Sequence, residues 1–433
     1  MTIRFDSAWS ASLEIAREVA DRGFEVVLVR DMLGRICLFL DGPDELPLDE
    51  TTQRIRETAG LFTAPSPVIA ASDLIDQDSI MRSPDLVRIS GEAGNGGLSV
   101  LERSVIGGDW RRPGIDPPSR RVSLYGFKGG VGRSTAVFML AQHLAEQGKT
   151  VLVVDLDLES PGVGSLAQRE ENLAEHGIVD HLIEAGVGNA DGLDLVSRSQ
   201  VITASRYGEV WLASTGGRPR DGYDYLAKLN RVYTDLAPDD DGNPRDFGSR
   251  LEAAIAACEA QVEATGGRSP DVVLLDSRAG LHDIAAVALT RLSSLNLLFA
   301  ADTPQTWSGY RMLLSQWRSL DNRADLTRRL RMVSSMTPSR DPESYLAGFA
   351  DHAQSCFAET LYEDADAGDL ESLNFPVGDE TAPHYPWPIL FHTDLVGLDP
   401  AQRPEWYGED YVKTAFGDFL SLATDWIFGT DNA

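Results

Sequence analysis

The chain has 433 residues, of which 42% are hydrophobic and 24% charged, and its formal net charge at pH 7 is −29. This length exceeds one ordinary domain, so we expect two. No apolar run approaches the roughly 18 residues of a membrane-spanning helix, and the N-terminus carries no basic-then-apolar signal pattern, so we expect a cytoplasmic protein. Non-specific nucleic-acid binding is disfavoured for the molecule as a whole, because it depends on Lys and Arg that neutralise phosphates.

The first segment, residues 1–106, predicts a small α/β domain. Apolar residues recur at helical spacing over 9–20. Two apolar, β-rich runs at 24–29 and 36–40 predict a hairpin, and a second helix is expected at 48–58. Nothing in this segment has the spacing of a catalytic site. We therefore expect either an interaction or regulatory domain or a structural cap on the larger C-terminal part of the chain.

A stretch rich in Gly and Pro without periodicity, residues 107–119, has the composition of a linker. Residues 120–430 then predict an α/β domain with a mostly parallel central sheet flanked by helices. The three cysteines are isolated, so they predict neither a disulfide framework nor a C-x-x-C metal site: Cys37, Cys258 and Cys356.

A glycine-rich turn between an apolar strand and a helix is the most informative stretch. It reads Leu124-Tyr125-Gly126-Phe127-Lys128-Gly129-Gly130-Val131-Gly132-Arg133-Ser134-Thr135. Three glycines let the main chain curl with its N–H groups inward, and the helix N-terminus adds partial positive charge, so the turn predicts a phosphate cradle. Arg133 is expected to hold the β- and γ-phosphates and Ser134 to coordinate Mg²⁺. A nucleoside triphosphate with magnesium is the predicted ligand.

Two residues depart from the plain P-loop pattern G-x-x-x-x-G-K-[ST]. Phe127 stands where the pattern has glycine, and Arg133 stands where it has lysine. Arginine is a rigid, permanently charged fork rather than a compact ammonium. We therefore expect phosphate binding to survive the exchange more securely than fast hydrolysis.

The run from Lys128 to Thr135 resembles the deviant Walker motif of the ParA/MinD-type P-loop ATPases of the SIMIBI class, K-G-G-x-G-K-[ST]-[ST]. The similarity covers about residues 120–310 and is weaker to about 395. It implies an ATP-sandwiched dimer in which Lys128 reaches the partner's phosphates. It also implies that the loop residues bind the nucleotide: Lys128, Gly129, Gly130, Val131, Gly132, Arg133, Ser134 and Thr135.

A buried strand expected at 150–154 delivers two acidic residues, Asp155 and Asp157. Alternation along an extended strand end puts both carboxylates on one side, where they can support a magnesium shell or orient water. The family resemblance identifies 155–162 with switch I and implies that Asp157 positions the attacking water, with Asp155 supporting the metal. The alternative is a pair of solvated turn aspartates.

Four consecutive aliphatic residues, 272–275, predict a strand buried on both faces that ends at Asp276. This is the Walker B arrangement, so Asp276 is expected near the metal. The family ending Asp-x-x-x-Gly implies that Gly280 offers an N–H to the γ-phosphate and that 281–284 form switch II. Arg278 replaces the usual proline, and a phosphate, the partner subunit or a neighbouring carboxylate are its possible partners.

The remaining sequence predicts strands at 295–300, 330–336 and 386–391 and a terminal helix at 411–428. That helix carries one lysine and lacks the basic amphipathic character of a membrane-binding tail. Three polar residues at strand ends, Asp302, Thr303 and Thr337, are candidates for the base, whereas Trp307 and Trp317 are expected in the core. An arginine cluster, Arg323, Arg328, Arg329 and Arg331, is the densest basic candidate, and we interpret it as a solvated surface. Residues 238–244 predict an acidic loop without the frame of a calcium site.

Taken as a whole, the sequence predicts an ATP-binding and hydrolysing switch that forms an ATP-dependent dimer and controls a partner protein through its N-terminal domain. The expected catalytic residues are Lys128, Asp157 and Asp276, and the expected metal site is Ser134, Asp155 and Asp276. Two alternatives stay open. One is a nucleotide-gated regulatory module with negligible hydrolysis, as in a bacterial signalling or defence system, and the other is a P-loop phosphotransferase.

Overall fold

A computed structural model describes most of the chain: residues 3–42, 45–74, 77–81, 83, 86–91, 96–103, 108–111, 117–202, 204, 207–236, 244–363, 373–403 and 405–429. Residues 107 and 112–116 of the predicted linker 107–119 lie outside these ranges, as does the acidic loop 238–244 except its last residue. The chain divides into two units, residues 1–112 and 113–433, and each is described by itself.

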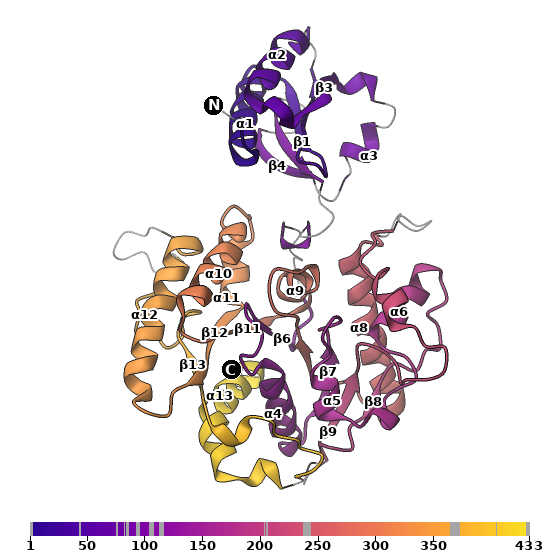
Figure 1. Ribbon diagram of the computed structural model, residues 1–433, viewed down its shortest axis with the longest axis vertical. Coiled ribbons are helices and arrows are strands. Elements are labelled where there is room, and N and C mark those ends of the chain that lie inside the picture. Colours follow the sequence, from indigo (N-terminus) through magenta and orange to yellow (C-terminus); the bar gives the residue numbers. More distant parts are fainter. Residues whose placement is uncertain are drawn as a thin grey trace. The chain divides into compact units, whose positions relative to one another are not determined.

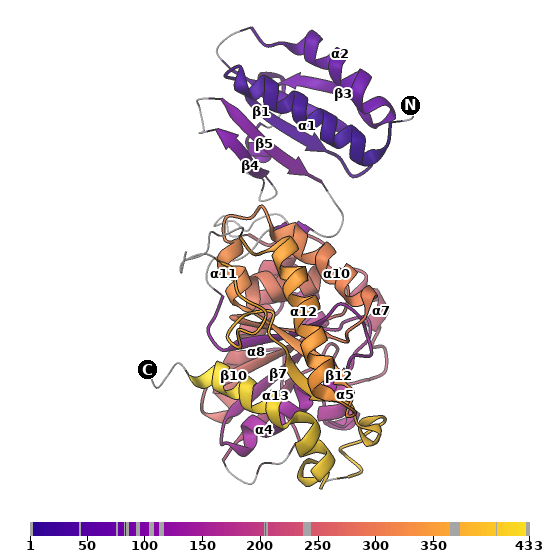
Figure 2. The same cartoon turned by 90° about the vertical axis from the view of Figure 1, so that its left-hand side faces the viewer.

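The first unit is a five-stranded sheet with two long helices (Figure 2). The strand order is β3-β2-β1-β5-β4, and β1 pairs antiparallel with β2 and parallel with β5. The elements are α1 Phe5–Asp21, β1 Glu25–Arg30, β2 Ile36–Asp41, α2 Leu48–Ala59, β3 Thr63–Ala70, α3 Gln77–Met81, β4 Leu86–Gly91 and β5 Gly97–Glu102. The predicted helices and hairpin are confirmed, whereas β3, β4 and β5 were not predicted.

The second unit is built on an eight-stranded sheet in the order β13-β12-β11-β6-β10-β7-β9-β8 (Figure 1). Every neighbouring pair is parallel except β8 with β9. The strands are β6 Arg121–Gly126, β7 Thr150–Asp155, β8 Ser197–Arg198, β9 Glu209–Ala213, β10 Val272–Asp276, β11 Leu295–Ala300, β12 Leu330–Thr337 and β13 Trp387–Leu390. The predicted fold class, an α/β P-loop fold with a mostly parallel sheet and a separate N-terminal α/β unit, is confirmed.

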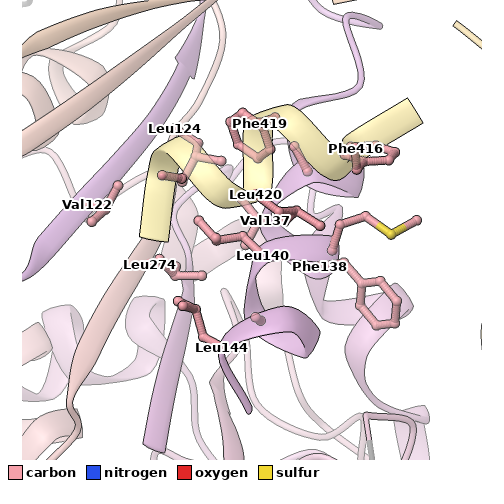
Figure 3. Packing of buried hydrophobic residues seen from close by; sticks show 14 of the residues in the cluster. Val122, Leu124, Val137, Phe138, Leu140, Leu144, Leu274, Phe416, Phe419 and Leu420 are labelled. Carbon is pink, nitrogen blue, oxygen red and sulfur yellow. The ribbon is translucent and has the colours of Figure 1, made fainter. Parts of the chain in front are cut away.

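The helices of the second unit cover its sheet. They are α4 Arg133–Glu146, α5 Val163–Ala167, α6 Ile178–Gly186, α7 Tyr225–Leu229, α8 Phe247–Gly266, α9 Asp283–Val287, α10 Pro304–Leu314, α11 Arg323–Arg328, α12 Pro342–Thr360 and α13 Asp410–Phe428. Helices α4 and α13 pack together over the sheet, with Leu140 and Phe419 in one apolar cluster (Figure 3). Helices α6 and α8 belong to a separate cluster with Leu251 and Val154. The central strands are thus buried on both faces, which explains their aliphatic composition.

The arginine cluster is not uniformly solvated, which corrects the sequence interpretation. Arg331 is buried, and its guanidinium carbon lies 3.5 Å from the ring centroid of Trp426. Arg323 forms an ion pair with Glu363 at 2.7 Å. The planar guanidinium can stack on an aromatic face, so burial of Arg331 has a physical reason.

Two further expectations concerned buried tryptophans and membrane-spanning helices. Trp307 and Trp317 are buried, as predicted for core residues. Within the described parts of the chain, no helix has both the length and the apolar content that crossing a bilayer requires.

Candidate functional site

The glycine-rich loop between β6 and α4 is open and shaped by glycine. Gly130 and Gly132 have φ angles of 76° and 77°, a left-handed conformation that costs other L-residues energy. Apart from the flanking residues, no heavy atom of the described part of the chain lies within 4 Å of the positions that a Cβ would occupy at Gly129, Gly130 or Gly132. Helix α4 begins directly after the loop, at Arg133, and has 14 residues. The main chain therefore leaves room for an anion at a helix N-terminus.

Two aromatic residues hold the loop in place. The ring of Phe127 fills a gap that exists because residue 309 is glycine, since a Cβ at Gly309 would lie 2.1 Å from that ring. The Tyr125 hydroxyl donates to the carbonyl oxygen of Gly280 at 3.1 Å. Phe127, which departs from the P-loop pattern, thus anchors the loop against α10.

The two strand-end carboxylates Asp155 and Asp276 lie side by side. The parallel register of β7 and β10 pairs these residues, and both are fully buried. Asp155 accepts main-chain N–H groups from Asp157, Gly162 and Gly164 at 3.1, 3.1 and 3.2 Å, so it organises the segment that follows β7. A Cβ at Gly162 would lie 3.1 Å from the Ser134 hydroxyl oxygen. Ser134 therefore lies against this same segment.

Arg133 connects the carboxylates of Asp276 and Asp157. Its Nε donates to Asp276 Oδ1 at 2.6 Å, and its Nη2 donates to Asp157 Oδ2 at 3.1 Å. Burial alone would lower the pKa of Arg133, but the charges of Asp276 and Asp157 outweigh it and raise that pKa. The guanidinium expected over the phosphates is bound to acidic side chains in this structure.

Burial and neighbouring charges shift the pKa values of the site's acidic residues. Burial raises the pKa of Asp155, and the neighbouring charge of Asp276 raises it further, against the main-chain N–H groups that lower it. Burial also raises the pKa of Asp157, although Arg133 opposes this effect. The Oδ2 atom of Asp276 is buried and accepts no hydrogen bond from the described residues. Arg133 thus pairs with two of the three carboxylates, those of Asp157 and Asp276.

The other predicted nucleotide contacts lie around this centre. Lys128 is exposed, forms no ion pair within the described residues, and has its Nζ 5.9 Å from the Phe127 ring centroid. Val131 is buried, whereas Thr135 is partly exposed in the first turn of α4. Gly280 has a φ of 81°, and its N–H donates to Gly126 O across a long 3.4 Å.

A second polar cluster, Glu159, Tyr233, Arg278 and His282, was not predicted. Arg278 forms an ion pair with Glu159, which answers the question left open for Arg278 in favour of a neighbouring carboxylate. The Tyr233 hydroxyl donates to Glu159 Oε1 at 2.5 Å, and His282 Nε2 lies 3.6 Å from the same oxygen. Burial lowers the pKa of His282, although Glu159 opposes that effect. The cluster joins the segment after β7 to the segment after β10.

A cavity of about 690 Å³ adjoins Asp155. Its walls include Gly164, Gln168, Thr215 and Tyr225. The hydroxyl of Tyr225 donates to Leu158 O at 2.6 Å, which fixes that ring against the switch I segment. The cavity therefore offers space for a small molecule beside the carboxylates.

The strand-end residues proposed near a base already have partners within the protein. Asp302 accepts from Trp307 Nε1 at 2.6 Å, and Thr303 accepts from the N–H of Thr306 at the start of α10. Thr337 is fully buried, and its hydroxyl donates to Ser334 O at 2.9 Å. These contacts stabilise the strand ends and give no evidence for a base-binding role.

The residues present fit a triphosphate as they stand. They fit a magnesium ion only when a nucleotide is bound as well. The open loop accepts phosphate oxygens, and Asp276 Oδ2 offers a buried ligand atom. Among the described residues, no three His, Cys, Asp or Glu side chains are grouped so as to hold a metal by themselves. Mg²⁺ is commonly held by one or two carboxylates together with substrate phosphates, so an ion here requires the nucleotide and a free Asp276.

Comparison with known sequences identifies the segment that carries the loop. Residues 119–203 match a family model described as an AAA domain. The chromosome-partitioning ATPase Soj of Thermus thermophilus is 39% identical over 77 residues, which are 18% of this chain and 31% of that protein. Nitrogenase iron protein 2 of Methanothermococcus thermolithotrophicus is 31% identical over 136 residues, which are 28% of this chain and 44% of that protein. The chain spans less than half the length of these relatives.

Two solved structures are remotely similar. The pNOB8 ParA bound to non-specific DNA is 14% identical with a TM-score of 0.42, covering 73% of this chain and 99% of that one. Cobyrinic acid a,c-diamide synthase from Mycobacterium smegmatis, with a bound ATP analogue and magnesium, is 18% identical with a TM-score of 0.37, covering 54% of this chain and 82% of that one. At these TM-scores neither structure assigns a position or a role to a side chain here.

Proposed function

We propose that this chain, whose residues 119–203 form a P-loop ATPase segment of the ParA/MinD/Soj type, is an ATP-binding and hydrolysing molecular switch. One observation carries the proposal. The open glycine loop, the hydroxyl of Ser134 and the buried carboxylates of Asp155 and Asp276 converge on one site. Phosphoryl transfer needs positioned charge more than covalent chemistry, and this site offers both cations and carboxylates.

Each residue then has a proposed task. The loop from Gly129 to Thr135 binds the phosphates through main-chain N–H groups, and Arg133 adds its charge to them. Asp157 orients the attacking water, and Gly280 offers an N–H near the γ-phosphate. Ser134, Asp155 and Asp276 would hold Mg²⁺, which neutralises the charge that develops on the phosphates.

The proposed active form is a homodimer that sandwiches ATP. Lys128 is exposed and forms no ion pair within the described part of its own chain, so its ammonium is available to a partner's phosphates. The N-terminal unit is proposed to dock a partner protein. We expect the protein to act in the cytoplasm, without a membrane-binding role, and the net charge of −29 disfavours nucleic acid over the whole surface.

Two measurements on the full chain test this proposal. Calorimetry with ATP should show saturable binding, and purified protein should release phosphate in the presence of Mg²⁺. Gly130→Val is the matched variant, because a branched side chain would enter the open loop at a φ of 76°. Absence of ATP binding by the wild-type chain, or equal binding by Gly130→Val, would defeat the proposal.

A nucleotide-gated module with negligible hydrolysis is the second candidate. The ion pairs of Arg133 with Asp276 and Asp157 favour it, because they occupy the carboxylates that hydrolysis needs. Saturable ATP binding without phosphate release would support this candidate over the first.

A phosphotransferase is the third candidate, favoured by the cavity beside Asp155, which leaves space for an acceptor. Incubation with γ-labelled ATP distinguishes it from the others. Label transferred to protein or to a small molecule, rather than released as phosphate, would support phosphotransfer.

A further inference from the structure

Arg133 is the one buried cation of the site among the described residues, and it binds the carboxylates rather than pointing into the open loop. The side chains of Arg133, Asp157 and Asp276 are 9%, 13% and 0% exposed, so water contributes little to the balance of their charges. The hydrogen bonds of 2.6 and 3.1 Å from Arg133 bridge two acidic groups that belong to different strand ends. The guanidinium therefore acts as a counter-ion inside the protein.

We propose that Arg133 excludes divalent cations from Asp276 until a bound triphosphate draws the guanidinium away. Nucleotide and metal would then reach the site in a fixed order, with the nucleotide first. This inference rests on the proposed function, because it concerns the regulation of the same site.

Arg133 and a metal ion compete directly for the carboxylate of Asp276. Asp276 Oδ1 accepts from Arg133, while Asp276 Oδ2 is buried and has no hydrogen-bond partner among the described residues. A metal ion at Oδ2 would lie beside a guanidinium already bound to the same carboxylate, so two like charges would repel each other at short range. Mg²⁺ also demands nearly ideal octahedral geometry and gives up its water reluctantly. The ion pair and the metal cannot both be well accommodated.

Arginine is better suited than lysine to bridge the two carboxylates. A guanidinium is a planar fork that can donate to two carboxylates at once, whereas an ammonium is a compact point charge on a flexible stem. Arg133 uses Nε for Asp276 and Nη2 for Asp157, so the bridge depends on the fork. The arginine that replaces the lysine of the P-loop pattern is therefore suited to holding the carboxylates together.

The guanidinium of Arg133 has an alternative position close by, at the glycine-rich loop. Arg133 is the first residue of α4 and directly follows Gly132, whose Cβ position faces open space. Rotation of the side chain would carry the guanidinium toward phosphates in the loop without a change in the helix. A triphosphate has more negative charge than the carboxylates that Arg133 would leave, so it can compete for the guanidinium.

The test is a Mn²⁺ titration of the full chain, followed by electron paramagnetic resonance. We compare the wild type, Asp276→Asn, Arg133→Gln and the double variant Arg133→Gln with Asp276→Asn. We expect the acidic surface to give all four proteins the same weak background of Mn²⁺ binding. Without nucleotide, Arg133→Gln should gain one site about tenfold tighter than that background, because removal of a neighbouring charge changes affinity by this order. The double variant should lose the site, and the wild type should not have it.

A second arm adds a non-hydrolysable ATP analogue to the wild type. A Mn²⁺ site that depends on Asp276 should now appear. A site in the nucleotide-free wild type that Asp276→Asn removes, or no gain in Arg133→Gln, would overturn the inference. If Arg133→Gln does not fold, Arg133→Lys replaces it. A gain is still expected because a single ammonium cannot bridge both carboxylates, but it should be smaller because the positive charge remains.

Failure of the proposed function would look different. In that case calorimetry would detect no binding of the analogue to any variant, whereas the nucleotide-free titrations would still report whether Arg133 excludes the metal. If the analogue binds and no Asp276-dependent Mn²⁺ site appears in the wild type, the proposed order of binding is wrong.

Discussion

The glycine-rich loop and the carboxylates beside it belong to one site but differ in exposure and in charge balance. The loop is exposed main chain, shaped by Gly130 and Gly132, with open space where side chains would lie. The carboxylates of Asp155 and Asp276 are fully buried, and the cation of Arg133 already neutralises part of their charge. In the proposed function, phosphate binding therefore needs no rearrangement of the loop, whereas hydrolysis needs Arg133 to move. The difference implies that affinity and turnover can be changed separately.

The largest expected effect comes from Lys128→Ala. We expect ATP hydrolysis to fall on the order of 10³-fold or more, because a cation supplied by a partner at the γ-phosphate contributes a rate factor of this size. Calorimetry should show nearly unchanged ATP binding. Lys149→Ala is the control, since the Nζ of Lys149 lies 4.3 Å from the Phe428 ring centroid and has no role in the site. An unchanged rate in Lys128→Ala would remove the lysine from the mechanism.

Gly132→Ala tests the open loop. The substitution places a Cβ into the space proposed for phosphate, so we expect ATP affinity to fall at least about tenfold. The φ of 77° should in addition lower the free energy of unfolding by about 1–2 kcal/mol. Gly148→Ala is a matched control, because Gly148 has a φ of 84° and equally open surroundings. Urea unfolding should show similar destabilisation of both variants. Equal loss of affinity in both would contradict a specific role for the loop.

Arg278→Gln tests the connection between the segments after β7 and β10. The partly exposed ion pair with Glu159 contributes about 1 kcal/mol, so hydrolysis should fall about fivefold while ATP affinity stays within about twofold. Arg311→Gln is the control, because it removes an exposed ion pair with Glu359 on α10 and α12. If both variants hydrolyse ATP like the wild type, the Glu159 cluster has only a structural role.

Tyr233→Phe should have the smallest effect. It removes the hydrogen bond to Glu159 at 2.5 Å but leaves the ion pair with Arg278, so the free energy of unfolding should fall by about 1 kcal/mol. Hydrolysis should change less than about twofold. A larger loss of hydrolysis than in Arg278→Gln would assign the tyrosine, rather than the ion pair, the main role in the cluster.

The sequence predicted those elements whose burial is visible as a local pattern of apolar residues. Strands β6, β7, β10 and β11 are buried on both faces and therefore appear as aliphatic runs. Helix α8 was missed because its buried face contains small residues such as Ala254 and Cys258, which contrast weakly with the exposed face. Strand β4 was missed because Val87 and Ile89 are 39% and 45% exposed and its pairing with β5 is not a local property.

The sequence predicted those parts of the site that depend on the main chain, but not the partners of its side chains. Strand ends in a parallel sheet meet at one edge, so the proximity of Asp155 and Asp276 follows from their positions after aliphatic runs. The partners of Arg133 depend on the direction of its side chain and on the register of β7 against β10, and neither can be read from the motif. The ion pair of Glu159 with Arg278 joins two distant segments, and only the acidic and basic residue types could have suggested it.

The most direct measurement is a crystal structure of the chain with a non-hydrolysable ATP analogue and Mg²⁺. The distance from Arg133 Nε to Asp276 Oδ1 is 2.6 Å in the present structure. We predict that this hydrogen bond breaks, that the guanidinium contacts phosphate oxygens, and that Asp276 turns to the metal. A bound nucleotide with the Arg133–Asp276 hydrogen bond intact would contradict this prediction.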